Sequence, residues 1–229
     1  MAEIIFLGTK GEIEESTRKH KYHTSTLFIY RKFKLLIDYG TLQKFSLEKI
    51  KPNAILITHA HPDHYLWSVK SCRTNVPVYL LKDTFKNGKF KPNNFKFITS
   101  KKIKIGSFLI LPFKILHSLK CSSVGFKIFL KKTSIIYTGD VVETPHKKIL
   151  FHADYYIGDG SSIKANLVKK KNGKRFGHAR ITTQINWCKK ARIKNIIFTH
   201  VGKETLKHED EIKKKYNVII AYDGMRIKI

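Results

Sequence analysis

The chain has 229 residues, of which 42% are hydrophobic and 12% aromatic, enough to bury one sizeable core. No apolar run approaches the roughly 20 residues that cross a bilayer, so we expect a soluble protein without a membrane-spanning helix. Lysine and arginine number 45 against 17 acidic residues, a formal net charge of +28, which favours a polyanionic partner such as nucleic acid. A general lysine bias of the composition would produce the same charge, and both interpretations stay open.

The first residues and the cysteines predict a cytoplasmic protein. Residues 1–7 lack the charged start and the long apolar stretch of a signal peptide. Cys72, Cys121 and Cys188 are too widely spaced for a CxxC metal site, and three cysteines do not make a disulfide framework. We therefore expect reduced cysteines. Because no linker-like stretch divides the chain, we also expect a single domain over residues 1–229.

Short apolar runs separated by glycines and polar turns predict strands in the first quarter of the chain. They cover residues 3–7, 26–30, 35–38 and 54–57. The polar stretch between the first two runs contains His20 and His23, which we expect to be solvated loop residues.

Three histidines and one aspartate follow the last of these runs directly, as His59, His61, Asp63 and His64. Pro62 cannot continue a strand ladder, so the cluster belongs at the strand's end. His59 and His61 point to one face of an extended segment, whereas the next two donors lie in the turn and can face a second point. One loop can therefore supply two metal ions. Imidazole and carboxylate donors without a neighbouring cysteine suit Zn²⁺, Mn²⁺ or Fe.

Residues 59–64, which read H-A-H-P-D-H, resemble the HxHxDH signature of the metallo-β-lactamase superfamily. The resemblance implies an α+β fold in which two sheets lie between two layers of helices, a four-layer αββα sandwich. It also predicts further metal ligands later in the chain.

The remaining elements can be taken in chain order. Residues 65–70 predict a short helix, and residues 82–97 contain many turn formers and predict a variable loop. The basic run at 169–175 reads as a loop. Strands are expected at residues 77–81, 103–105, 108–115, 124–130, 134–137, 155–158, 195–199 and 218–221, and helices at 179–191 and 204–216.

Single residues at the ends of these strands match the later ligands of the family. The resemblance assigns His59, His61 and His117 to one ion and Asp63, His64 and His200 to the other, with Asp140 bridging the two. It also makes Asp38 a candidate to support a ligand imidazole. The implied cofactor is a pair of divalent ions, Zn²⁺ first and Mn²⁺ or Fe as alternatives. Such a pair lowers the pKa of a shared water from about 15.7 toward about 7 and supplies a bridging hydroxide at neutral pH.

Gly177 and His178 resemble the Gly-His motif of the RNase Z-like and cyclic phosphodiesterase-like branch, in which a non-ligand histidine faces the phosphate. The resemblance implies a phosphodiesterase or a nuclease, with His178 assisting the leaving group and Asp63 orienting the hydroxide. A capping or surface role for His178 is the structural alternative. The substrate class would be a phosphodiester, DNA and RNA included. Basic residues that we expect to guide such a substrate are Lys170, Lys171, Lys174 and Arg175.

Two other functions fit the same sequence. One is a small-molecule hydrolase acting on a cyclic phosphodiester, a lactone or a thioester, for which the basic surface is irrelevant. The other is a nucleic-acid-binding accessory protein that keeps the metal fold for its structure alone. The sequence leaves open the metal, the exact substrate, endo or exo cleavage and the oligomeric state.

Overall fold

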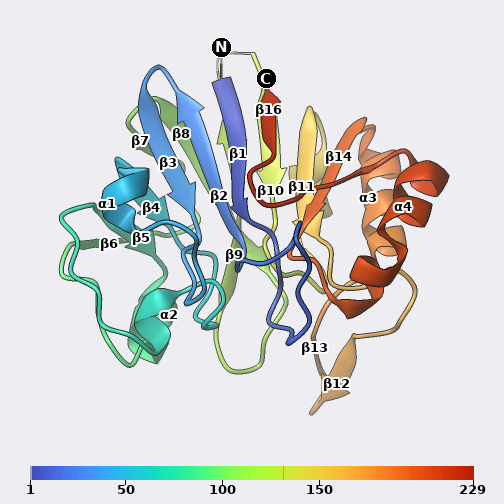
Figure 1. Cartoon of the computed structure of the whole chain (residues 1–229), viewed down its shortest axis with the longest axis horizontal. Coiled ribbons are helices and arrows are strands. Elements are labelled where there is room, and N and C mark those ends of the chain that lie inside the picture. Colours follow the sequence, from blue (N-terminus) through green and yellow to red (C-terminus); the bar gives the residue numbers. More distant parts are fainter. Residues whose placement is uncertain (1, 131) are drawn as a thin grey trace.

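Two seven-stranded sheets pack face to face between two pairs of helices in the computed structural model, which describes residues 2–130 and 132–229 (Figure 1). The first sheet has the spatial order β16 (Arg226–Lys228), β1 (Ala2–Gly8), β2 (Ser25–Tyr30), β3 (Phe33–Ile37), β4 (Ala54–Leu56), β5 (Val78–Leu80) and β6 (Phe95–Phe97). The second has the order β15 (Ile219–Ile220), β14 (Asn195–Thr199), β11 (Tyr155–Asp159), β10 (Ser134–Tyr137), β9 (Ser123–Phe129), β8 (Phe108–Ile115) and β7 (Ile103–Ile105).

The helices cover the outer faces of the two sheets. In Figure 1 α1 (Leu47–Ile50) and α2 (Lys82–Asn87) lie beside the first sheet, and α3 (Ile181–Ala191) and α4 (Lys203–Tyr216) lie beside the second. The four-layer αββα sandwich expected from the sequence is therefore confirmed. Within residues 2–130 and 132–229, no helix is long and apolar enough to cross a membrane.

Successive side chains of a strand point to opposite faces of its sheet, and this alternation explains the layers. In β4, Ala54 and Leu56 belong to the core between the sheets, whereas Ile55 faces α1. In β14, Ile197 points into the central core, and its neighbour Phe198 packs with residues of α3. Because successive strand residues face opposite sides, strands that are covered on both sides read as continuous apolar runs, as these two do.

The directions of the strands place their ends at one edge of the molecule. In the second sheet β8, β10, β11 and β14 all run the same way. β9 is antiparallel to both β8 and β10, and β11 is parallel to its neighbours β10 and β14. In the first sheet β1, β3 and β4 share one direction for the same reason. The loops that leave these strands meet at the lower end of Figure 1, opposite the chain termini.

Residues 82–97 correct one expectation, because this segment is not an irregular loop. It forms α2 and the edge strand β6, joined by the predicted turn formers. Phe85 of α2 packs against Phe95 and Phe97 of β6, with ring centroids 4.4 and 5.5 Å apart. These long-range aromatic contacts stabilise the segment, and local turn propensity does not reveal them.

The basic run at 169–175 is likewise a β-hairpin and not a loop. β12 (Lys169–Lys171) pairs antiparallel with β13 (Lys174–Phe176), and the hairpin projects from the body of the protein in Figure 1. Asn172 and Gly173 form the two-residue turn, with positive φ at both positions, as Asn-Gly hairpin turns require. The short helix expected at residues 65–70 is reduced to one 3₁₀ turn, Leu66–Ser68.

Candidate active site

Seven side chains from four distant segments meet at the shared edge of the two sheets. The loop after β4 supplies His59, His61, Asp63 and His64, and the ends of β8, β10 and β14 supply the other three. They form two groups whose ligand atoms lie within 4.8 Å of one another. One group is His59, His61, His117 and Asp140, and the other is Asp63, His64, Asp140 and His200.

The carboxylate of Asp140 belongs to both groups and faces each with a different oxygen. Its Oδ2 lies 3.6 Å from His59 Nε2 and 3.4 Å from His117 Nε2. Its Oδ1 lies 3.1 Å from His64 Nε2 and 3.3 Å from His200 Nε2. A carboxylate placed this way can bridge two cations, which is the arrangement that the sequence resemblance implies.

Hydrogen bonds on the outer side of the cluster orient the histidines of the first loop. His64 Nδ1 donates to Asp38 Oδ2 at 2.8 Å, and the Thr58 hydroxyl donates to the same carboxylate. Because that hydroxyl proton is already used, His59 Nδ1 donates to Thr58 Oγ1 at 3.0 Å. Both rings therefore direct Nε2 into the cluster, which is how outer partners orient metal-binding histidines.

Two histidines from the second sheet are held in the same way. His117 Nδ1 donates to the carbonyl of Gly177 at 2.8 Å, and His200 Nδ1 donates to Ser161 Oγ at 2.9 Å. Gly177 has φ +106, a conformation that side-chain-bearing residues rarely adopt. His200 itself has φ +55 and is strained; such strain persists where the surrounding structure imposes it, commonly at functional sites.

The donor atoms fit a pair of cations. When Nδ1 alone carries a proton, the Nε2 atoms of His64 and His200 present lone pairs to carboxylate oxygens 3.0 to 3.3 Å away. Acceptors facing acceptors at this distance repel one another unless a positive charge lies between them. Several of the atoms are also buried without a hydrogen-bond partner among the described residues: His59 Nε2, Asp63 Oδ1, His64 Nε2 and Asp140 Oδ1.

The charge states of the side chains agree with this interpretation. Burial lowers the pKa of His59 well below 6.5 and that of His117 to about 4, so both are neutral and able to bind a cation. Burial opposes the charge on His200 as well, but the Asp140 carboxylate raises the pKa of His200 to about 10. In the absence of a cation, a proton is therefore attracted to the position between these carboxylates and imidazoles.

His178 lies beside both groups and belongs to neither, although it forms a third group of possible ligands with Asp140, Asp159 and His200. Its Nδ1 donates to Asp159 Oδ2 at 2.8 Å, and its ring stacks on His200 with centroids 5.4 Å apart. Burial alone would lower the pKa of His178, but the Asp159 carboxylate raises it above 6.5. His178 also lines a cavity of about 640 Å³ together with His61, Asp63 and Asp140. The ring is 23% exposed, so a molecule in this cavity can reach it.

Sequence reasoning missed two residues of the site, Asp159 and Ser161. Asp159 is fully buried, accepts from His178, and also accepts the Ser161 hydroxyl, which in turn receives His200 Nδ1. Together they connect His178 to a proposed ligand. The signal was present, because Asp159 ends a strand of the second sheet at the edge where such sheets place their functional residues.

The four basic residues expected to guide a substrate lie together on the hairpin, where Lys170 pairs with Arg175 and Lys171 with Lys174, but only two of them line a cavity. Lys174 and Arg175 line a second cavity beside His117, and Arg175 forms an ion pair with Glu143. Lys170 and Lys171 are exposed on β12 and line neither of these two cavities.

The expectation that His20 and His23 are solvated is wrong. His20 is buried, with Nδ1 2.8 Å from Thr9 Oγ1 and Nε2 3.3 Å from Glu209, and His23 is partly buried. These contacts anchor the loop after β1, whose residues Glu12 and Ile13 line the 640 Å³ cavity. Local polarity predicted a solvated loop, and most of its residues are at least partly exposed, but contacts with Thr9 and with Glu209 of α4 bury His20.

We expect His20 to make the protein less stable in mild acid. Burial lowers the pKa of His20 below 6.5, and the opposing effects of Glu209 and Asp223 do not restore it. As pH falls through 6.5 the unfolded chain takes up the proton first, so stability is lost with falling pH. Urea unfolding of wild-type and His20→Gln protein at pH 7.5 and 5.5 measures this loss. The stability advantage of the wild type is expected to shrink at pH 5.5, and a constant difference would contradict the assignment.

The fold and the paired His/Asp groups together define a metal-dependent hydrolase of the metallo-β-lactamase fold. The chain belongs to the beta-lactamase superfamily, because the family model described as beta-lactamase superfamily domain matches residues 40–201. A comparison with curated proteins found no match.

Solved structures with the same fold cover nearly the whole chain at low sequence identity. The metallo-beta-lactamase fold protein YhfI from Bacillus subtilis is 17% identical, with a TM-score of 0.75 and coverage of 99% of this chain and 98% of that one. A diphosphatase from the PhnP family is 17% identical, with a TM-score of 0.74 and coverage of 100% and 98%. The short form of human tRNase Z is 18% identical, with a TM-score of 0.69 and coverage of 99% of both chains.

Proposed function

We propose that this hydrolase cleaves phosphodiesters and that its substrates include nucleic acid. The observation that carries the proposal is the position of His178, which lies outside both proposed metal groups. Asp159 holds its ring at the cavity that residues of both groups line. A hydrolase that opens a thioester has less need of a second proton donor, because a thiolate departs without protonation more readily than the alkoxide of a phosphodiester. The structural likeness to proteins described as a diphosphatase, a tRNase Z and yeast PDE1 is consistent with phosphate-ester chemistry.

The side chains divide the work of in-line hydrolysis. Two bound divalent ions would lower the pKa of a water and offset the charge of the phosphate oxygens; the metal identity is open, with Zn²⁺ proposed first and Mn²⁺ or Fe as alternatives. Asp63 Oδ1, which is buried and has no hydrogen-bond partner among the described residues, can accept a hydrogen bond from the attacking water or hydroxide and orient it. His59, His61, His64, His117 and His200 are the proposed imidazole ligands, and Asp63 and Asp140 the proposed carboxylate ligands.

His178 then assists the leaving group. The Asp159 carboxylate accepts from Nδ1, raises the pKa of His178 and so favours the doubly protonated ring, in which Nε2 also carries a proton. As the bond between phosphorus and the leaving oxygen breaks, this proton moves from Nε2 to that oxygen. The products are a phosphomonoester and an alcohol, and general acid catalysis of this kind contributes roughly 10²–10⁴ to the rate.

A substrate panel tests the proposal. Protein loaded separately with Zn²⁺, Mn²⁺ or Fe is assayed on single-stranded DNA, RNA, bis-p-nitrophenyl phosphate, a lactone and a thioester. We expect turnover of the phosphodiesters that disappears in Asp140→Ala protein. Turnover of the lactone and thioester alone would refute the phosphodiesterase assignment and support the small-molecule hydrolase instead.

The basic hairpin is expected to affect long substrates more than short ones. Replacing Lys170, Lys171, Lys174 and Arg175 with glutamine removes four positive charges from β12 and β13. We expect KM to rise for a long nucleic acid, with the rise shrinking at high salt, because attraction to phosphates is screened. The same variant is assayed on bis-p-nitrophenyl phosphate as the control, and equal effects on both substrates would contradict a guiding role.

A further inference from the structure

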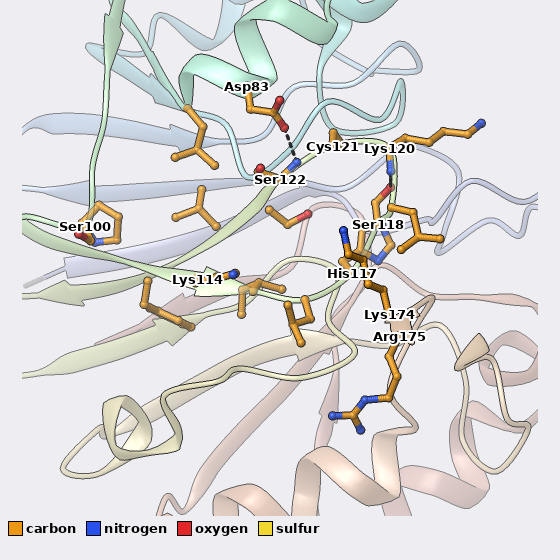
Figure 2. Close-up of a pocket in the computed structure, with 18 of the residues that line it drawn as sticks. Asp83, Ser100, Lys114, His117, Ser118, Lys120, Cys121, Ser122, Lys174 and Arg175 are labelled. Carbon is orange, nitrogen blue, oxygen red and sulfur yellow. Dashed lines mark hydrogen bonds between the residues drawn. The ribbon is translucent and has the colours of Figure 1, made fainter. Parts of the chain in front are cut away.

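A second, larger cavity lies beside the candidate active site. Its volume is about 960 Å³, at the upper end of the roughly 300–1,000 Å³ typical of ligand pockets. Figure 2 shows it between α2, which carries Asp83, and the strands and loop that carry Lys114, His117 and Lys120. The cavity is open to solvent, and nothing in the proposed chemistry at His178 requires it.

The two cavities are joined through shared parts. His117, a proposed ligand, lines the larger cavity, and its ring lies 4.9 Å from the ring of His178, which lines the smaller one. The segment from Lys174 to His178 also connects them, since Lys174 lies at the larger cavity and His178 at the smaller. A linear molecule that is cleaved beside His178 can therefore continue past His117 into the larger cavity.

The walls of the larger cavity combine positive charge with apolar surface. Lys114, Lys120 and Lys174 line it, and none of the three forms an ion pair within the part of the chain that the structure describes. Its one acidic residue, Asp83, accepts a hydrogen bond from the backbone N–H of Ser122, as the dashed line in Figure 2 shows. Apolar contact is offered by Leu119, which is 41% exposed.

We propose that this cavity binds the nucleotides next to the scissile phosphodiester of a single-stranded nucleic acid. Lysines on the rim suit successive phosphates, as in the positively charged grooves that bind single strands, and the exposed Leu119 beside Lys120 offers an apolar surface to an unstacked base. The volume suits a few unpaired nucleotides and excludes a duplex, whose major groove alone is about 12 Å wide. The inference rests on the proposed phosphodiesterase function and specifies the substrate as an oligonucleotide strand.

A binding experiment tests the cavity independently of turnover. The metal-loaded His178→Ala protein is titrated with fluorescent six-nucleotide RNA and DNA, with and without Lys114→Gln and Lys120→Gln. Single-strand binding carries a salt slope of about 0.7 per phosphate contact, so losing two contacts is expected to reduce the slope by about 1.4 and the affinity by about tenfold. Lys189→Gln with Lys190→Gln, on the exposed end of α3, removes the same charge as a matched control and is expected to leave both unchanged.

Substrate length gives the second measurement. We expect kcat/KM to rise from a dinucleotide to longer strands until the cavity is filled, and to level off beyond that. Lys114→Gln with Lys120→Gln should remove this rise and leave bis-p-nitrophenyl phosphate hydrolysis unchanged. Equal losses in the cavity and control variants, or a rate that does not depend on length, would overturn the cavity assignment alone. Lysine-dependent binding of either strand without any phosphodiester turnover would overturn the proposed function and leave the cavity assignment standing.

Discussion

Replacing Asp140 with alanine is expected to reduce kcat/KM for phosphodiesters by well over about 100-fold. The two oxygens of this carboxylate face different groups of histidines, so its loss weakens both proposed cation sites at once. Loss of an outer partner typically costs about 10–100-fold in metal affinity or activity, and loss of a shared ligand should exceed that range. Metal content, measured by plasma mass spectrometry, is expected to fall together with activity.

Two other variants serve as comparisons for the loss of activity expected in Asp140→Ala. Asp38→Asn keeps every proposed ligand and changes the carboxylate that accepts from His64 Nδ1 and from Thr58, so we expect an intermediate loss of about 10–100-fold. Asp210→Ala removes an exposed carboxylate on α4 and should have no effect. Asp140→Ala protein that retains wild-type metal content and turnover would show that the two groups do not hold catalytic ions.

His178→Ala is the second large effect, with an expected fall in kcat/KM of about 10²–10⁴ for RNA or DNA. Metal content should stay unchanged, because His178 is outside the two groups assigned to the ions. The loss should be much smaller for bis-p-nitrophenyl phosphate, since its nitrophenolate leaving group needs little help from an acid. This contrast between leaving groups separates proton donation from a purely structural role.

The control for His178 is His146→Ala, which removes an exposed histidine outside the site cavities and should leave both activities intact. Asp159 acts through His178 and is a positioning residue. Because its carboxylate raises the pKa of His178, Asp159→Asn should move the alkaline limb of the pH–rate profile to lower pH. Equal losses for both leaving groups, or loss of metal in the His178 variant, would contradict the role as acid.

Most strands were predictable because a strand that is covered on both faces reads as a continuous apolar run, and the layers were implied by the family resemblance. The expectations failed where distant contacts outweighed local signals. Residues 82–97 contain turn formers, but the rings of Phe85, Phe95 and Phe97 hold a helix and an edge strand together. His20 reads as a solvated loop residue, but contacts with Thr9 and Glu209 bury it.

By itself the sequence determined that a cluster of potential metal ligands follows β4, because four donors are packed into six consecutive positions and no folding is needed to bring them together. Only the tertiary structure decided which remote side chains complete the cluster, that Asp140 faces both groups, and that Asp159 and Ser161 tie His178 to His200. The physical reason is that strands of both sheets end at one edge of the molecule. Side chains up to about 140 residues apart in sequence become neighbours there, as the contact between Asp63 and His200 shows.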